Sequence, residues 1–130
     1  MIDPKGERFT VHVDKGNVTG LTWNGDFRAK AILSFSDQMR ADRLKRDMLG
    51  PGPYDGVDGE VLAQAIMLSS LAVRLTEWPK WWINGTEHSD TNLLQEVYNN
   101  VIRIRDEYFV KMEADGKKDQ EELKQIAEKK

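Results

Sequence analysis

The side chains that most often carry catalysis or bind metal ions are few in this chain, and they do not converge. The two histidines, His12 and His88, lie in different segments, and neither has a carboxylate or a second histidine one helical turn away. We expect both to be ordinary exposed histidines. The chain has no cysteine and no Gly-x-Ser-x-Gly motif, so no nucleophile is expected. The sequence therefore predicts no catalytic residue, no metal site and no cofactor, and a protein that is not an enzyme.

The acidic loop around residues 55–60 resembles a calcium-binding loop only faintly. The regular spacing of acidic side chains and the distant glutamate of such a loop are missing. Asp58 is better explained as the N-cap of a helix, with Glu60 near the positive end of the helix dipole.

A basic run between positions 40 and 46 could contact a partner. It comprises Arg40, Arg43, Lys45 and Arg46. Aspartates at positions 42 and 47 lie among these residues, and intrahelical ion pairs such as Asp42–Arg46 account for most of the pattern. Nucleic-acid binding is therefore kept only as an alternative function from another class. Because arginine is enriched at protein interfaces, we predict that Arg40, Arg43 and Arg46 lie at a protein contact.

Three of the four tryptophans fall within five residues, at Trp78, Trp81 and Trp82. One interpretation is a corner that staples the preceding helix onto the next helix and the sheet. The other is that Trp81 or Trp82 anchors a partner, because large aromatic side chains dominate interface hot spots. Three adjacent large rings cannot all enter one small core, so at least one should be partly exposed.

Composition bounds the fold. The chain has 130 residues, of which 39% are hydrophobic and 32% charged, which suits a single domain. The formal net charge is −3, which argues against a general nucleic-acid binder. No apolar run approaches the roughly 20 residues of a transmembrane helix, and no signal peptide is visible, so neither a membrane nor secretion is expected.

The first third of the chain predicts strands. Phe9–Val13 alternates apolar and polar residues, Val18–Trp23 is rich in β-formers, and Asp26–Leu33 alternates again. Asn24-Gly25 is the strongest short hairpin signal. We therefore predict a three-stranded antiparallel meander at the N-terminus.

Helical periodicity follows from Ser34 or Ser36 onward, and three helices are predicted. The first should bury Met39, Leu44 and Met48 and end at Gly50. The second, starting near Asp58, is apolar on most sides and should be the central helix. The third begins at Ser89 or Asp90. The fold class is thus α+β, with the meander packed on three α-helices.

The last residues form a charged segment with a narrow apolar stripe at Leu123, Ile126 and Ala127. We predict a single domain over residues 1–116 and a charged C-terminal helical tail over residues 117–130. The tail is either a separate packed helix or a continuation of the third helix past Gly116. Leu123 and Ile126 are the candidate interaction residues of this tail.

Four segments together carry a family resemblance: Phe27–Ser34, Arg43–Gly50, Leu71–Trp82 and Asn92–Tyr98. A meander leads into an Arg/Lys-rich helix ending in Leu-Gly, and a hydrophobic helix is followed by Pro and then Trp-Trp. Over residues 9–110 this order resembles small proteins of the structural gene clusters of tailed bacteriophages, often described as tail assembly chaperones or as uncharacterised virion proteins.

The resemblance implies a role in virion assembly through protein–protein binding and no enzymatic activity. A tail assembly chaperone would bind tape-measure and tail-tube subunits in the host cytoplasm. The alternative is a capsid decoration, cement or connector component retained in the virion. The partners would be other phage structural proteins, and a homo-oligomer is also open.

Overall fold

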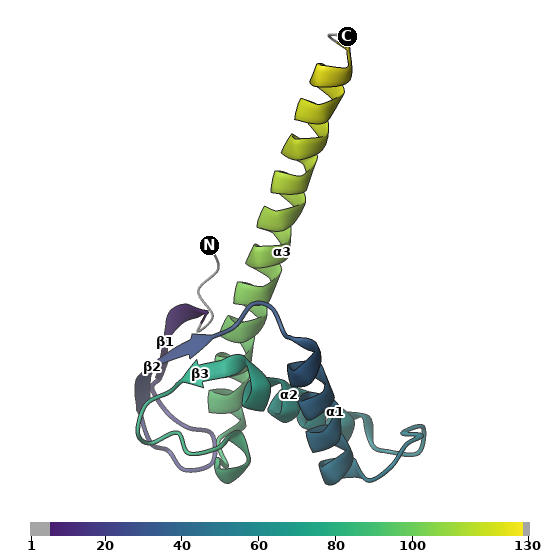
Figure 1. Cartoon of the computed structure of the whole chain (residues 1–130). Coiled ribbons are helices and arrows are strands. Elements are labelled where there is room, and N and C mark those ends of the chain that lie inside the picture. The colour runs from purple at the N-terminus through teal and green to yellow at the C-terminus, as the bar shows by residue number, and fades with distance from the viewer. Residues whose placement is uncertain (1–5, 129–130) are drawn as a thin grey trace.

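The computed structural model describes the backbone of residues 6–128 and the side chains of residues 6–114. The described chain is α+β, with a three-stranded antiparallel sheet and three α-helices, which confirms the predicted class (Figure 1). In chain order the elements are β1 (Glu7–Val13), β2 (Trp23–Ala29), α1 (Phe35–Leu49), α2 (Gly59–Arg74), β3 (Leu75–Glu77), the short 3-10 turn η1 (Gly85–Glu87) and α3 (Thr91–Glu128).

The sheet has the order β1-β2-β3, and both neighbouring pairs are antiparallel. The alternation in β1 works as predicted, because Phe9, Val11 and Val13 are buried while the residues between them are exposed. Phe9 stacks on Phe27 of β2, with the ring centroids 5.4 Å apart. One face of the β1–β2 pair thus forms the floor of the core.

The third strand is not where the sequence predicts it. Residues 14–22 form a loop, and β3 comes directly after α2, where Leu75 pairs with Ala29. Asn24-Gly25 lies inside β2 and not in a turn, with Gly25 opposite Val11. The reason for this glycine is close packing, because a Cβ atom there would lie 2.6 Å from Cγ of Pro79.

The loop of residues 14–22 is held against the start of α3 by Asp90. The Asp90 carboxylate is almost completely buried and accepts hydrogen bonds from the backbone N–H groups of Val18 and Thr19, the Thr19 hydroxyl and the Trp23 indole. Burial alone would raise the pKa of Asp90, but these hydrogen bonds lower it well below its usual range. A polar latch therefore replaces the predicted strand pairing.

α1 begins at a capping box in which Ser34 accepts from the backbone N–H of Asp37 and Asp37 accepts from that of Ser34. It packs against α2 along one narrow side, where Ala41 and Leu44 are half-buried. Met39, predicted to be buried, is 62% exposed. The prediction is wrong because α1 lies outside the main core and contacts α2 along one narrow side, which leaves Met39 exposed.

The core lies between the sheet, α2 and the first half of α3. α3 contributes five buried apolar residues: Leu93, Leu94, Val97, Val101 and Ile104. α2 buries Ala65, Leu71 and Val73 but exposes Val61 and Ile66, so it is less central than predicted.

α3 runs as one helix from Thr91 to Glu128, so the charged tail continues the third helix and the helical path passes straight through Gly116. Beyond Ile104 no described side chain of α3 is buried. Figure 1 shows this second half of α3 projecting from the body as a stalk. Among the described helices, none is both long enough and apolar enough to cross a bilayer.

Candidate protein-binding surfaces

Trp82 is a core residue and not an exposed anchor. Its side chain is 4% exposed, stacks on His88 at 4.8 Å between ring centroids and meets the edge of Phe27 at 5.3 Å. A partner could reach Trp82 only if the surrounding segment opened. The interpretation of this cluster as a corner staple fits this position.

Trp81 is half-buried and completes the same corner. Its indole N–H donates to the carbonyl oxygen of Asn24 at 2.8 Å, and its ring lies 4.9 Å from that of Trp23. Trp78 is the tryptophan that remains largely outside, at 51% exposed. Trp81 and Trp82 therefore stabilise the fold, and Trp78 is the tryptophan of this cluster that a partner could contact most easily.

His88 lies in this aromatic corner, against Trp23, Trp81 and Trp82, so the expectation that it is exposed is wrong. Its Nε2 atom is buried and has no hydrogen-bond partner among the described residues. Burial lowers the pKa of His88, and the nearby Asp90 and Glu87 carboxylates only partly offset this effect. The ring therefore serves as a neutral aromatic packing element.

His12 is exposed, as expected, on the outer side of β1. Hydrogen bonds to Asn24 and Asp14 raise its pKa. His12 lies on the outer face of the sheet, whereas His88 packs against Trp23 and Trp82 on the core side, so the two histidines form no common site. Within residues 6–114 no group of three or more histidine or acidic side chains is placed to hold a metal ion.

α1 presents an exposed face that combines apolar and basic side chains. Phe35 is 82% exposed and Met39 is 62% exposed, and they lie one helical turn apart. Arg43 and Arg46 continue the same face, and together these residues border an open groove of about 410 Å³. We call Phe35, Met39, Arg43 and Arg46 the α1 face; it contains two of the three arginines that the sequence nominates.

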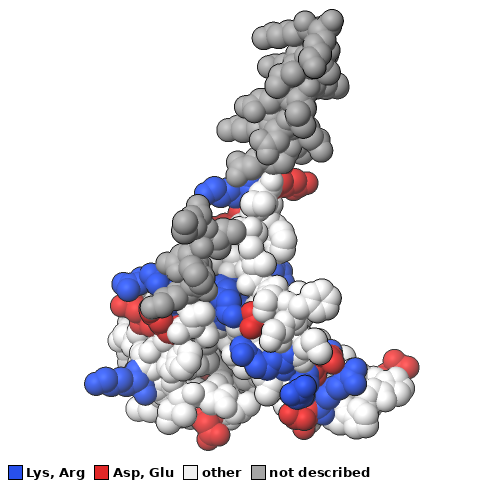
Figure 2. All heavy atoms as spheres, viewed as in Figure 1, with Lys and Arg blue, Asp and Glu red and all other residues white. Residues whose placement is uncertain are grey.

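Acidic neighbours compensate most of the positive charge of α1. Arg46 lies 3.0 Å from Asp42 and Arg40 lies 3.6 Å from Asp37, whereas Arg43 makes no ion pair with any described residue. Figure 2 shows blue and red side chains next to one another over α1. Such a mixed surface suits a protein partner better than a phosphate backbone.

Asp37 is also held from the body of the protein. Its carboxylate accepts a hydrogen bond from Nζ of Lys30 at 2.7 Å, which is the main reason why the pKa of Asp37 lies below its usual value. This ion pair fixes the start of α1 and hence the position of Phe35. The α1 face thus lies on a helix whose first turn is tied to the segment that follows β2.

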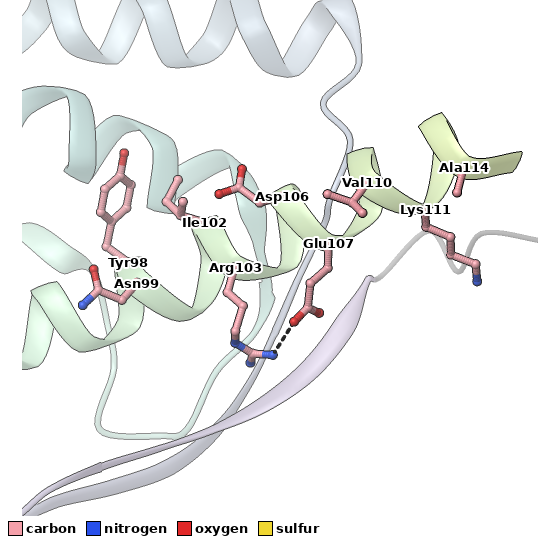
Figure 3. A pocket seen from close by; sticks show the side chains of 9 residues that line it. All are labelled: Tyr98, Asn99, Ile102, Arg103, Asp106, Glu107, Val110, Lys111 and Ala114. Carbon is pink, nitrogen blue, oxygen red and sulfur yellow. Dashed lines mark hydrogen bonds and ion pairs between the residues drawn. The ribbon is translucent and has the colours of Figure 1, made fainter. Parts of the chain in front are cut away.

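The stalk of α3 carries the second candidate surface. Phe109, Val110 and Met112 are 57%, 66% and 49% exposed. An open groove of about 780 Å³ runs along the helix from Tyr98 to Ala114, and Figure 3 shows its lining side chains with the Arg103–Glu107 ion pair. The side chains of Leu123 and Ile126, which the sequence nominates, lie outside the described residues.

A cleft of about 480 Å³ separates α2 from the start of α3. Its walls include the apolar side chains of Met67, Leu68 and Leu94 together with uncharged polar groups such as Gln64 and Gln95. Glu60, Thr86, His88, Thr91 and Tyr98 also line this cleft, and the Nε2 atom of His88 has no hydrogen-bond partner among the described residues.

Sequence reasoning missed the exposed apolar side chains, which are the main features of both surfaces. Phe35 directly follows the N-cap Ser34, and the i, i+4 spacing of Phe35 and Met39 was a usable signal. The sequence analysis instead assigned Met39 to the buried stripe, because its position also fits a helix that is packed along its whole apolar side.

The chain matches no protein-family model, and comparisons with curated proteins and with solved structures likewise give no significant match.

Proposed function

We propose that this chain acts by binding another protein through the α1 face, as an accessory protein of bacteriophage virion assembly. The observation that carries the proposal is the exposure of Phe35 and Met39 side by side with Arg43 on a helix that the rest of the fold holds in place. Exposed large apolar side chains grouped with arginine are typical of interface hot spots.

The energetics of such a contact are adequate for specific binding. Complete burial of an exposed phenylalanine or methionine side chain contributes about 1.5–3 kcal/mol. Arg43 is free to pair with an acidic side chain of the partner, because it has no ion pair within the described part of the chain. We therefore expect the partner to present an apolar pocket with an acidic rim.

The viral setting of the proposal is supported by the sequence resemblance to proteins of tailed-phage structural gene clusters. A tail assembly chaperone, acting in the host cytoplasm on tape-measure or tail-tube subunits, is the first form of the proposal. A capsid decoration, cement or connector component that stays in the virion is the second. Both forms need a protein-binding surface and no catalytic group.

The test combines co-purification with analysis of finished particles. The tagged chain is isolated from infected cells and its partners are identified by mass spectrometry, and the same search is made in purified particles. Recovery of tape-measure or tail-tube subunits from cells, with the chain missing from particles, supports the chaperone form. Presence of the chain in particles at a fixed ratio supports the virion-resident form.

Two variants connect this result to the α1 face. Phe35→Asp should reduce recovery of the partner at least about tenfold, because it places a charge in the apolar contact. Ile83→Asp makes the same kind of change at another exposed apolar residue, 78% exposed in the segment before η1, and should leave recovery unchanged. Equal recovery with both variants would contradict the role of the α1 face.

A further inference from the structure

One edge of the sheet has no neighbouring strand. β1 pairs with β2 along one side, and no described strand pairs with its other side (Figure 1). The β1–β2 ladder has no bulge, and β1 contains neither proline nor lysine. Native proteins commonly use these features to protect an edge strand from further pairing. The free side of β1 is therefore open to another strand.

A hydrogen bond of β2 shows which backbone groups of β1 point to this free side. The carbonyl oxygen of Asn24 accepts from the indole N–H of Trp81, so it points away from β1. Residues directly opposite one another in an antiparallel ladder exchange both of their hydrogen bonds or neither. His12 lies opposite Asn24, so its backbone N–H and C=O point to the free side of β1. Because this direction alternates along the strand, the same holds for Arg8 and Thr10.

These three residues form a row of unpaired backbone donors and acceptors. Arg8, Thr10 and His12 are all exposed, and none of their backbone groups is bonded to another described residue. Their side chains lie on the outer face of the sheet, whereas the apolar residues of β1 between them face the core. The chemistry that fits such a row is the backbone of another extended strand.

We propose that β1 pairs with β1 of a second copy of this chain, antiparallel and centred on Thr10, so that the two sheets become one. In this register Thr10 lies opposite Thr10 of the second copy, and Arg8 lies opposite His12. Every unpaired backbone group of the row then gains a partner. A shift by two residues would instead pair one of the three residues with a position outside β1. Such a contact uses the same patch on both copies, as a two-fold dimer requires.

The charges at the two ends of β1 favour the second copy as the occupant and the antiparallel direction. Arg8 stands at the start of the strand and makes no ion pair with any described residue. Asp14 follows the end of the strand, and its carboxylate lies beside His12. Antiparallel pairing brings Arg8 next to the His12–Asp14 pair of the second copy, with Asp14 diagonal to it and within reach of a long side chain.

A symmetric parallel pair lacks both advantages. Each residue would lie opposite itself, so Arg8 would meet Arg8 and Asp14 would meet Asp14, and like charges opposite one another are destabilising. The outward backbone groups of the two Thr10 residues would also face each other directly, whereas a parallel ladder has slanted bonds to residues offset along the partner strand. The pairing is therefore antiparallel.

This inference does not depend on the proposed function, because β1 and the α1 face share no residue. Figure 1 shows the two elements on opposite sides of the body. The contact consists of one short strand from each copy, so we expect a dimer of moderate affinity.

The first experiment measures the oligomeric state of the purified full chain by sedimentation equilibrium, with thermal unfolding as the check that each variant is folded. The natural chain should be a dimer that dissociates on dilution. Thr10→Lys places two ammonium groups opposite each other at the centre of the contact and should raise the dimer dissociation constant at least about tenfold. Thr86→Lys, the same change at an exposed threonine of η1, should leave it unchanged.

The second experiment tests the direction by exchanging charges. Arg8→Asp and Asp14→Arg should each raise the dimer dissociation constant about threefold or more, because each places like charges side by side across the contact. The double variant should regain the natural value. Positions 8 and 14 lie about 20 Å apart along one strand, so a rescue must come from contacts between copies.

A natural chain that stays monomeric at the highest soluble concentration overturns the pairing altogether. Equal dissociation constants for Thr10→Lys and Thr86→Lys would remove β1 from the contact. A double variant as weak as the single ones overturns the antiparallel register. Since only the purified chain is used, a negative result here leaves the binding test of the α1 face untouched.

Discussion

Gly16 lies so close to Asp90 that a Cβ atom on this glycine would be 2.1 Å from an oxygen of the Asp90 carboxylate. The same carboxylate accepts four hydrogen bonds from Val18, Thr19 and Trp23. A glycine without positive φ is thus required here by packing and not by backbone conformation. The loop of residues 14–22 can close on α3 only where no side chain intervenes.

Gly16→Ala should therefore lower the free energy of unfolding by about 1–3 kcal/mol, the usual cost of overpacking a filled site. The matched control is Gly56→Ala, because a Cβ atom there would meet no atom within 4 Å. The control should change the free energy by no more than about 0.5 kcal/mol. Chemical denaturation followed by tryptophan fluorescence measures both values, and equal values would show that the Asp90 latch contributes little.

Local patterns in the sequence were enough to predict the fold class, the helix starts and the buried face of β1. The capping signal at Asp58 and the period of two in Phe9–Val13 act through nearby atoms, so they can be recognised from neighbouring residues. Their success reflects short-range physics. The start of α1 was left open between Ser34 and Ser36, with Ser36 expected as the N-cap, and the structure has Ser34 in that position.

The failures arise from contacts between distant segments. Asn24-Gly25 has the composition of a hairpin turn, but its glycine is needed where Pro79 packs on β2. Val18–Trp23 has β-forming residues, but its polar groups bond to Asp90, about 70 positions further along the chain. No local rule contains this information.

Trp82→Ala should destabilise the fold by about 3–5 kcal/mol, because it removes a large ring from a filled core. Trp78→Ala is the matched control at the exposed margin of the same corner and should cost less than about 1 kcal/mol. Thermal unfolding of both variants distinguishes a role of Trp82 in packing the core from a role in binding a partner. A Trp82→Ala protein of natural stability that loses only its binding partner would restore the anchor interpretation.

The candidate surfaces were only half visible in the sequence. Arg43 and Arg46 were nominated from composition, and they do lie on the exposed side of α1. Phe35 and Met39 escaped because an apolar residue at helical spacing is usually buried, and only the packing of α1 against a single neighbour leaves them outside. The exposure of these two side chains depends on how α1 packs in the tertiary structure, which local sequence patterns do not reveal.

His88 should make the fold less stable below neutral pH. Its pKa is lowered in the folded chain, so the unfolded chain binds the proton first as the pH falls through about 6.5. Stability is thus kept above this pH and decreases below it. The Tm at about pH 5 should be closer to the Tm at about pH 7.5 in His88→Phe than in the natural chain.

Other groups with shifted pKa values do not change the expected difference between the natural chain and His88→Phe. His12 has a raised pKa, which adds stability at low pH, but it is present in both proteins and cancels. Asp37 and Asp90 have lowered pKa values and stay ionised throughout the window. An identical pH dependence in both proteins would show that His88 is not desolvated.

The nucleic-acid alternative makes a separate prediction about salt. A protein that neutralises several phosphates loses affinity steeply as the salt concentration rises, because bound counterions are released. Arg40, Lys45 and Arg46 already lie within ion-pair distance of Asp37 or Asp42, so Arg43 is the one basic side chain of α1 without an acidic partner among the described residues, and the formal net charge of the chain is negative. We expect fluorescence anisotropy with labelled duplex and single-stranded DNA to show at most weak binding at low salt, unchanged in Phe35→Asp. Tight binding with a steep salt slope that is lost in Arg43→Glu would instead assign α1 to nucleic acid.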